Sequence, residues 1–228
     1  MTQSRTIGRV HSVRVGGPQT LPDPFQPGKT WRSSFRRHEV TGPVALDERR
    51  LEGDEVADKK YHGRPSQAML LFALPHYEQW RAEFDLPAMM PGGFGENLTI
   101  TDVTENDVCL GDHLQIGTAV VEITAPRVPC SKIDRNFGHK GITARVAETA
   151  RGGWYVRVIQ PGTLQAGEEV ALVKRVAPDV TVVDCARAWY GPAPFEAEAE
   201  RALASDVLLP EVREAIEQRL GKTTSAGG

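Results

Sequence analysis

Cys130 lies in a segment whose residue types favour a reactive thiol. Residues 125–132 read Ala-Pro-Arg-Val-Pro-Cys-Ser-Lys. The two prolines fix the backbone φ angle twice and predict a stiff bend, and Arg127 and Lys132 bring positive charge close to the thiol. Positive charge favours the thiolate, the form that ligates soft metals or attacks electrophiles. Cys130 is therefore a candidate catalytic residue and metal ligand. A small buried hydrophobe, the role of most free cysteines, stays open as the alternative.

The other two cysteines have the surroundings of packing residues. Cys109 lies in a predicted strand at residues 107–110, and Cys185 lies on a predicted helix beside Val182 and Trp189. Three cysteines in 228 residues cannot form a complete disulfide framework. We therefore expect all three to be thiols, with only Cys130 available for chemistry.

Residues 51–66 combine glycines with basic side chains. Glycines leave backbone N–H groups free to point at an anion, and Lys59 and Arg64 add positive charge. The segment predicts an anion-binding loop; a polar connection between two strands is the plainer interpretation.

Residues 91–98, Pro-Gly-Gly-Phe-Gly-Glu-Asn-Leu, lead into a predicted strand at residues 98–101. Glu96 and Asn97 offer acceptor and donor groups that could line the rim of a pocket. A glycine-rich strand entry without a ligand explains the same residues.

Composition excludes several classes of protein. The apolar share of 40% and the net charge of -3 do not fit a disordered chain, and the pI of about 6.1 argues against a binder of nucleic acid polymers. No HExxH, CxxC, GxGxxG, Walker or GxSxG pattern occurs. The first residues lack a secretory apolar region, and the apolar run at residues 68–74 is far shorter than the ~20 residues of a membrane span. We expect a cytoplasmic protein that does not contact membranes.

The pattern along the chain predicts a mainly β fold, a β-barrel with a small C-terminal three-helix unit. We expect residues 1–176 to form the barrel domain, residues 177–222 the helical domain and residues 223–228 a frayed tail. Thr181 and Asp184 have the spacing of a capping box that opens the first of these helices. Exposed strand edges or the helical tail could mediate a homodimer.

Short strands are expected throughout the barrel. Two hairpins are predicted: residues 113–116 with 119–124 across Gly117-Thr118, and residues 154–159 with 169–176 across Pro161-Gly162. A buried strand is predicted at residues 66–73, a helix is predicted to begin at Pro75 and another to cover residues 141–150. Residues 16–28, rich in proline, are predicted to form a surface loop.

The chain resembles a known family in four motifs. Glu-Gly-Asp-x5-Lys-x-His-Gly (residues 52–63), Gly-Glu-Asn-Leu (95–98), Leu-Gly-Asp (110–112) and Pro-Arg-x-Pro-Cys-x-Lys (126–132) are similar to those of the MOSC domain, named after the C-terminal domain of molybdenum cofactor sulfurases. The resemblance runs in order over residues 40–176. The three-helix tail resembles that of the YiiM-type subfamily.

This resemblance implies a β-barrel that binds a pyranopterin molybdenum cofactor, with Cys130 as the ligand of molybdenum. It implies reduction of small N-hydroxylated compounds, such as N-hydroxylated base analogues, with electrons from a separate flavin-containing reductase. Other family members are sulfur carriers or are fused to pyridoxal-phosphate-dependent sulfurases. Motif position then suggests the remaining cofactor-binding candidates: Arg127, Lys132, Arg64 and Lys59 for the pterin phosphate, and Glu96, Asn97 and His62 for the pocket.

Three hypotheses stay open at this point. The first is a molybdenum-dependent oxidoreductase, the second a sulfur-transfer module that carries a persulfide on Cys130, and the third a non-enzymatic barrel that binds a small anion. Only the first requires molybdenum.

Overall fold

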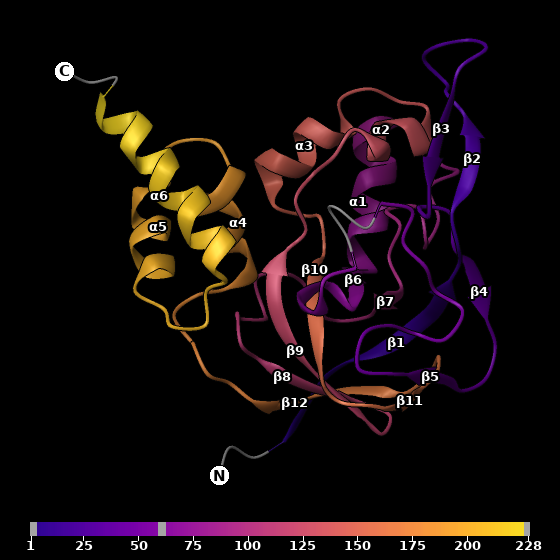
Figure 1. Cartoon of the computed structure of the whole chain (residues 1–228), viewed down its shortest axis with the longest axis horizontal. Coiled ribbons are helices and arrows are strands. Elements are labelled where there is room, and N and C mark those ends of the chain that lie inside the picture. Colours follow the sequence, from indigo (N-terminus) through magenta and orange to yellow (C-terminus); the bar gives the residue numbers. More distant parts are fainter. Residues whose placement is uncertain (1–3, 59–62, 226–228) are drawn as a thin grey trace.

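A closed barrel of seven strands forms the body of the protein (Figure 1). The computed structural model describes residues 4–58 and 63–225. Around the barrel the strands follow the order β1 (Arg5–Val15), β12 (Glu169–Lys174), β8 (His113–Ile116), β9 (Ala119–Pro126), β10 (Trp154–Gln160), β6 (Met69–Ala73) and β7 (Leu98–Ile100), which pairs again with β1. Only β6 and β7 pair in parallel; the other barrel pairs are antiparallel. The expected mainly β barrel is therefore confirmed.

Shorter elements decorate the barrel. Strand β4 (His38–Val40) adds to the edge of β1, and two small sheets pair β2 (Gln19–Pro22) with β3 (Thr30–Ser33) and β5 (Val44–Leu46) with β11 (Gly162–Leu164). A 3-10 turn at Pro65–Gln67 precedes β6. The helices are α1 (Pro75–Phe84), α2 (Lys132–Phe137), α3 (Ile142–Thr149), α4 (Val182–Tyr190), α5 (Glu196–Leu203) and α6 (Pro210–Ser225). Among the described residues, each helix is too short or too polar to pass through a bilayer.

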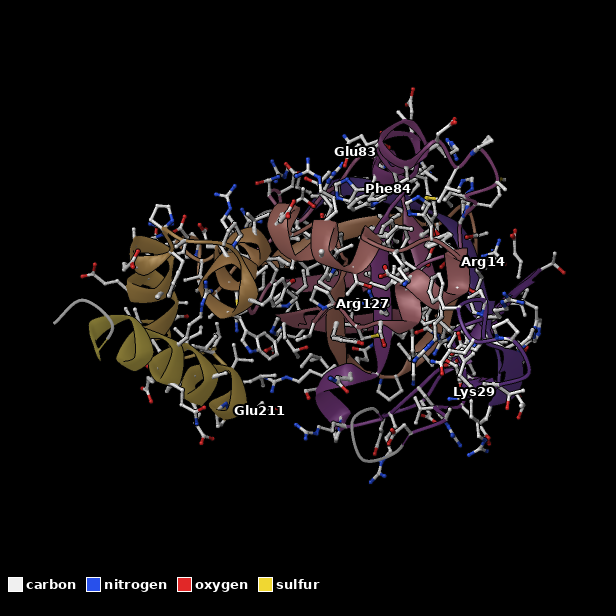
Figure 2. The ribbon with its side chains drawn as sticks, turned by 90° about the horizontal axis from the view of Figure 1, so that it is seen from above. Arg14, Lys29, Glu83, Phe84, Arg127 and Glu211 are labelled. Atoms are coloured by element: carbon white, nitrogen blue, oxygen red, sulfur yellow. The ribbon has the colours of Figure 1, made fainter. Side chains whose placement is uncertain are left out.

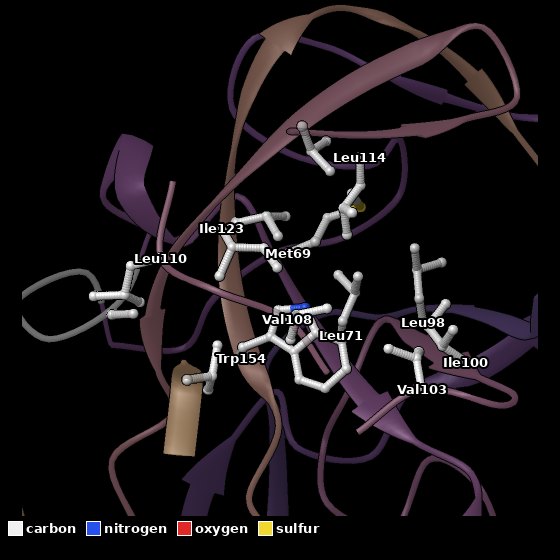
Figure 3. Close-up of a cluster of buried hydrophobic side chains, with 14 of the residues drawn as sticks. Met69, Leu71, Leu98, Ile100, Val103, Val108, Leu110, Leu114, Ile123 and Trp154 are labelled. Atoms are coloured by element: carbon white, nitrogen blue, oxygen red, sulfur yellow. The ribbon is translucent and has the colours of Figure 1, made fainter. Parts of the chain in front are cut away.

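Apolar side chains fill the inside of the barrel, and Figure 3 shows part of this buried cluster. Leu71 and Trp154, partners across β6 and β10, are both fully buried. Alternation along a strand sends their neighbours Leu70 and Tyr155 to the opposite face. The barrel interior is thus closed by its own side chains, and its outer wall is free to carry a site.

The hairpin of β8 and β9 forms as predicted, with Ile116 opposite Ala119. Gly117 adopts a φ of 59°, and a Cβ atom there would lie 2.3 Å from the carbonyl oxygen of Thr163, so the turn requires glycine. The predicted second hairpin is wrong. β10 pairs with β9 and β6, whereas β12 pairs with β8 and β1, because β11 leaves the turn to pair with β5 instead.

The expected surface loop at residues 16–28 is also wrong in part, since it contains β2. Backbone pairing from Gln19 opposite Ser33 to Pro22 opposite Thr30 makes a separate hairpin. Pro22, the proline of this strand, is tolerated because a two-stranded ribbon has a free edge.

The C-terminal helices pack on one side of the barrel (Figure 1). The predicted capping box is present: the Thr181 hydroxyl accepts from the Asp184 amide, and the Asp184 carboxylate accepts from the Thr181 amide. Val182, Phe195 and Ile216 belong to the same apolar cluster as the barrel strands. The domain boundary that we propose at residues 176 and 177 therefore crosses one continuous core.

Candidate functional site

A cavity of about 430 Å³ lies against the outer wall of the barrel. Leu70 of β6 and Tyr155 of β10, which are register partners, form part of its floor. Loops from distant parts of the chain complete it. Its walls come from within residues 33–37, 47–58, 63–70, 94–97 and 127–132.

Cys130 lies in the wall of this cavity, at the end of the loop that follows β9. The loop is held at both ends. On one side the Arg127 amide donates to the carbonyl oxygen of Gly153 at 3.0 Å. On the other, the carbonyl oxygen of Cys130 accepts from the Ile133 amide and from the Thr143 hydroxyl, both at 3.0 Å. Cys130 itself is half-buried and free of any disulfide.

Arg127 places a positive charge close to that sulfur. Its Nη2 lies 3.9 Å from the Cys130 Sγ, and its guanidinium lies 5.5 Å from the centre of the Phe35 ring. Only 3% of Arg127 is exposed, and its Nη1 has no hydrogen-bond partner among the described residues. A buried, half-satisfied guanidinium at a cavity wall is the group that an anionic ligand would complete. Figure 2 labels Arg127 in the middle of the molecule.

Two further buried polar atoms in the cavity lining lack partners in the described part of the chain. They are the Ser34 hydroxyl oxygen and the Oε1 of Gln67. Buried polar groups are normally satisfied, so these three atoms, the Nη1 of Arg127 included, are available to hydrogen-bond a polar group that enters the cavity. Within residues 4–58 and 63–225, no group of three or more His, Cys, Asp or Glu side chains could hold a metal ion by itself. A metal ion bound here would therefore need further ligands in addition to such side chains.

Tyr155 presents a phenol to the same cavity, close enough to Arg127 and Cys130 for both to act on it. Burial raises the pKa of Tyr155, with the nearby thiol acting in the same direction and the positive charge of Arg127 opposing it. The phenol therefore keeps its proton at neutral pH and is a hydrogen-bond donor.

Arg37 and Asp54 form a buried ion pair in the cavity wall. Arg37 donates to both carboxylate oxygens of Asp54, at 2.6 and 3.0 Å, and to the carbonyl oxygen of Gly95 at 2.5 Å. This bidentate pair ties three cavity segments together. Arg49 and Arg50 stand at the exposed side, on a turn closed by the Asp47 carboxylate.

The predicted residues Arg127, Lys132 and Asn97 all line the cavity. Lys132 begins α2, two residues after Cys130. The Oδ1 of Asn97 accepts from the Leu70 amide at 3.0 Å. Asn97 therefore holds the start of β7 against the cavity floor.

The structure does not bring Glu96 or Arg64 to the cavity lining. The Glu96 carboxylate is completely buried and accepts hydrogen bonds from the Tyr77 and Thr99 hydroxyls and from the Gly92 and Phe94 amides, at 2.6 to 3.2 Å. By accepting from the Gly92 and Phe94 amides, it holds the glycine-rich loop of residues 92–95 in place. Arg64 is exposed and pairs with Glu211 of α6 at 3.1 Å. Lys59 and His62 lie outside the described residues.

Sequence reasoning missed Arg37, Arg49, Arg50 and Tyr155. Tyr155 had a usable signal, because strand alternation places it opposite the inward Trp154. The arginines had none, since they enter the site through loop geometry. Cys109 and Cys185 are buried as predicted; burial raises the pKa of Cys109 to about 11 and that of Cys185 to about 12.

Comparison with known proteins places the chain in a family. The MOSC domain matches residues 58–171, and the chain is 38% identical over 183 residues to Protein YiiM of Escherichia coli (strain K12), covering 79% of each protein. The chain belongs to the MOSC domain family. The resemblance of the sequence to the YiiM-type subfamily is thereby confirmed.

Two other similarities extend this result. The crystal structure of YiiM from Geobacillus stearothermophilus superposes with a TM-score of 0.75 at 26% identity, covering 93% of this chain and 99% of that one. A protein named "Reductase" from Gibberella moniliformis (strain M3125 / FGSC 7600) is 31% identical over 188 residues, covering 79% of this chain but 30% of the longer protein. The family as a whole is associated with molybdenum cofactor sulfurases.

Proposed function

We propose that this protein binds a pyranopterin molybdenum cofactor in the cavity and reduces small N-hydroxylated compounds. The observation that carries the proposal is the pairing of a half-buried thiol, Cys130, with the partly unsatisfied guanidinium of Arg127 in one cavity wall. Membership of the MOSC family and the similarity to a protein named reductase support it.

The residues present fit this cofactor. A thiolate is the ligand that a soft metal prefers from protein, and Cys130 would hold the metal, with Arg127 stabilising its negative charge. When bound, the cofactor supplies a two-electron redox centre. The cations Lys132, Arg49 and Arg50 face the same space and are the proposed partners of its phosphate. Of the candidates that the structure does not describe, Lys59 and His62 stay predictions.

The remaining lining serves orientation and the exclusion of water. Phe35, Leu70 and Val128 give the cavity apolar walls against which a planar ring can pack. Asn97 and the Arg37–Asp54 pair fix the loops that carry these walls. The reaction converts an N–OH group to N–H and water and consumes two electrons and two protons. We propose that the electrons come from a separate flavin-containing reductase, and that the protein works in the cytoplasm.

A reduction assay tests this proposal. Protein isolated from a host that makes the cofactor is mixed, without oxygen, with an N-hydroxylated purine and a chemical electron donor such as reduced benzyl viologen. The amine product is measured chromatographically. We expect turnover by the wild type and by Cys185→Ala, and a decrease of at least about 100-fold in Cys130→Ser, because a hydroxyl is a far poorer ligand for soft metals. Equal rates in wild type and Cys130→Ser would refute the role of Cys130.

The same preparations separate the other two hypotheses. A sulfur-transfer module would show a mass increase of one sulfur atom that Cys130→Ser abolishes, without reduction of the purine. A non-enzymatic anion-binding barrel would show neither activity nor added sulfur, and its Cys130 would resist alkylation in the native, metal-free protein.

A further inference from the structure

The C-terminal helices form a hydrogen bond to the loop that carries Cys130. The hydroxyl of Tyr190, the last residue of α4, donates to the carbonyl oxygen of Arg127 at 3.0 Å. This contact joins two segments 63 residues apart in the chain. Burial raises the pKa of Tyr190 far above its ordinary value, so its hydroxyl keeps its proton and can donate at neutral pH.

The hydrogen bond completes a backbone clamp on Arg127. The Arg127 amide already donates to the carbonyl oxygen of Gly153, and the Gly153 amide donates to the Glu105 carboxylate at 2.7 Å. With its N–H held by Gly153, the residue before β10, and its C=O held by Tyr190 of α4, Arg127 has both of its backbone polar groups bound. Fixing them sets the direction in which the Arg127 side chain leaves the backbone, and its Nη2 lies 3.9 Å from the Cys130 sulfur.

The end of α4 is itself held by α6. The guanidinium of Arg219 donates to the carbonyl oxygens of Arg187 and Ala188, at 2.7 and 2.9 Å, and to that of Gly191. It also lies 3.4 Å from the centre of the Phe195 ring. Helix C-terminal carbonyls lack partners within their own helix, and Arg219 supplies them for α4. The position of Tyr190 therefore depends on all three C-terminal helices.

We propose that helices α4–α6 are a positioning element for the Cys130 loop, and that Tyr190 is the residue through which they act. Between its two fixed ends the loop is otherwise open: Val128 is 43% exposed, and Cys130 is half-buried. Without the Tyr190 hydroxyl, the Arg127 carbonyl loses its contact to α4, and the loop gains freedom to move Cys130 toward solvent.

The rate of alkylation of Cys130 in the metal-free protein tests this inference. Wild type and Tyr190→Phe are exposed to iodoacetamide near pH 8, and the label on each cysteine is followed by mass spectrometry. We expect Cys130 to react on the order of three to ten times faster in Tyr190→Phe, which corresponds to about 0.7–1.4 kcal/mol for the lost hydrogen bond. Cys109 and Cys185, buried and with raised pKa values, should stay unlabelled.

Cys109 and Cys185, which should stay unlabelled, make the test specific. If the Tyr190 hydroxyl only stabilised the fold, its loss would increase global unfolding, and all three cysteines would react faster together. That result would overturn the inference. An unchanged or slower rate at Cys130 would overturn it as well. Glu211→Gln is the matched control on α6: its exposed ion pair with Arg64 involves none of residues 127–132, so its loss should leave the rate unchanged.

A second variant covers the case in which Tyr190→Phe fails to fold. Arg219→Lys keeps the charge but loses the fork that binds several carbonyls at once. We expect the same selective acceleration at Cys130, smaller than in Tyr190→Phe. No acceleration in Arg219→Lys would contradict the inference. Because these measurements need no cofactor, they stand or fall separately from the proposed reductase activity.

Discussion

The inside of the barrel and the outer face of its β6–β10 wall are made from alternate residues of the same strands, yet they have opposite characters. Leu71 and Trp154 point inward and are fully buried in a cluster of apolar side chains. Leu70 and Tyr155, one position earlier and one later, face a cavity whose lining includes polar atoms without partners. Strand alternation therefore gives the same two strands one face in the apolar core and one face on the cavity.

The difference also explains why loops supply most of the candidate site. A filled interior cannot admit a ligand, so the site forms where segments from five parts of the chain lean on the outside of the wall. The barrel supplies a rigid floor, and the loops supply Cys130, Arg127 and the surrounding cations.

The largest loss of stability is expected from a substitution inside the barrel. Trp154→Ala removes a fully buried ring from the centre of the barrel (Figure 3), and we expect it to lower the free energy of unfolding by about 3–5 kcal/mol. Tyr155→Phe, one residue along, keeps the ring and should cost less than about 1.5 kcal/mol. Urea denaturation of both variants measures the contrast. Equal losses would mean that the two faces do not differ as described.

The second largest loss of stability is expected from a substitution of the buried Glu96. Its carboxylate accepts four hydrogen bonds behind the glycine-rich loop, and Glu96→Gln replaces one oxygen with a group that cannot accept. We expect a loss of about 1–3 kcal/mol in the free energy of unfolding. The exposed Glu39, paired with Arg14, is the control: Glu39→Gln should change stability by less than about 1 kcal/mol. A Glu96→Gln variant as stable as the control would disprove the organising role.

The smallest predicted effect concerns Cys185. Its pKa is raised to about 12 by burial, so the folded state holds this proton more tightly than the unfolded state, whose thiol titrates near its ordinary value of 9. The resulting stabilisation is fully present below about pH 9 and is lost as pH rises toward 12. Cys185→Ala should therefore lose stability less steeply than wild type between pH 9 and 11. Parallel curves from denaturation at several pH values would contradict the raised pKa.

The sequence predicts those parts of the fold that depend on neighbouring residues. The hairpin around Gly117, the helix beginning at Pro75 and the capping box of Thr181 and Asp184 each depend on neighbouring residues, and each is present. The pairing of β10 and β12 depends on which distant strands they meet, and proximity in sequence predicted the wrong partners.

The candidate site also divides into residues with a local sequence signal and residues placed by long-range contacts. Cys130, Arg127 and Lys132 share one short segment, and the structure places them together in the cavity lining. Arg37 is held in that lining by Asp54, 17 residues away, and by the carbonyl oxygen of Gly95, and no local sequence pattern indicates either contact. Glu96 was expected at the pocket, but its spacing in the loop could not indicate that Tyr77 of α1 would turn its carboxylate inward.

The molybdenum content of purified protein tests the central claim most directly. Wild type and Cys185→Ala, isolated from a host that makes the cofactor and assayed before any loss on storage, should contain about one molybdenum atom per chain. Cys130→Ala should contain almost none, because its only proposed protein ligand is gone. Wild-type molybdenum content in Cys130→Ala would contradict the assignment of Cys130 as the ligand.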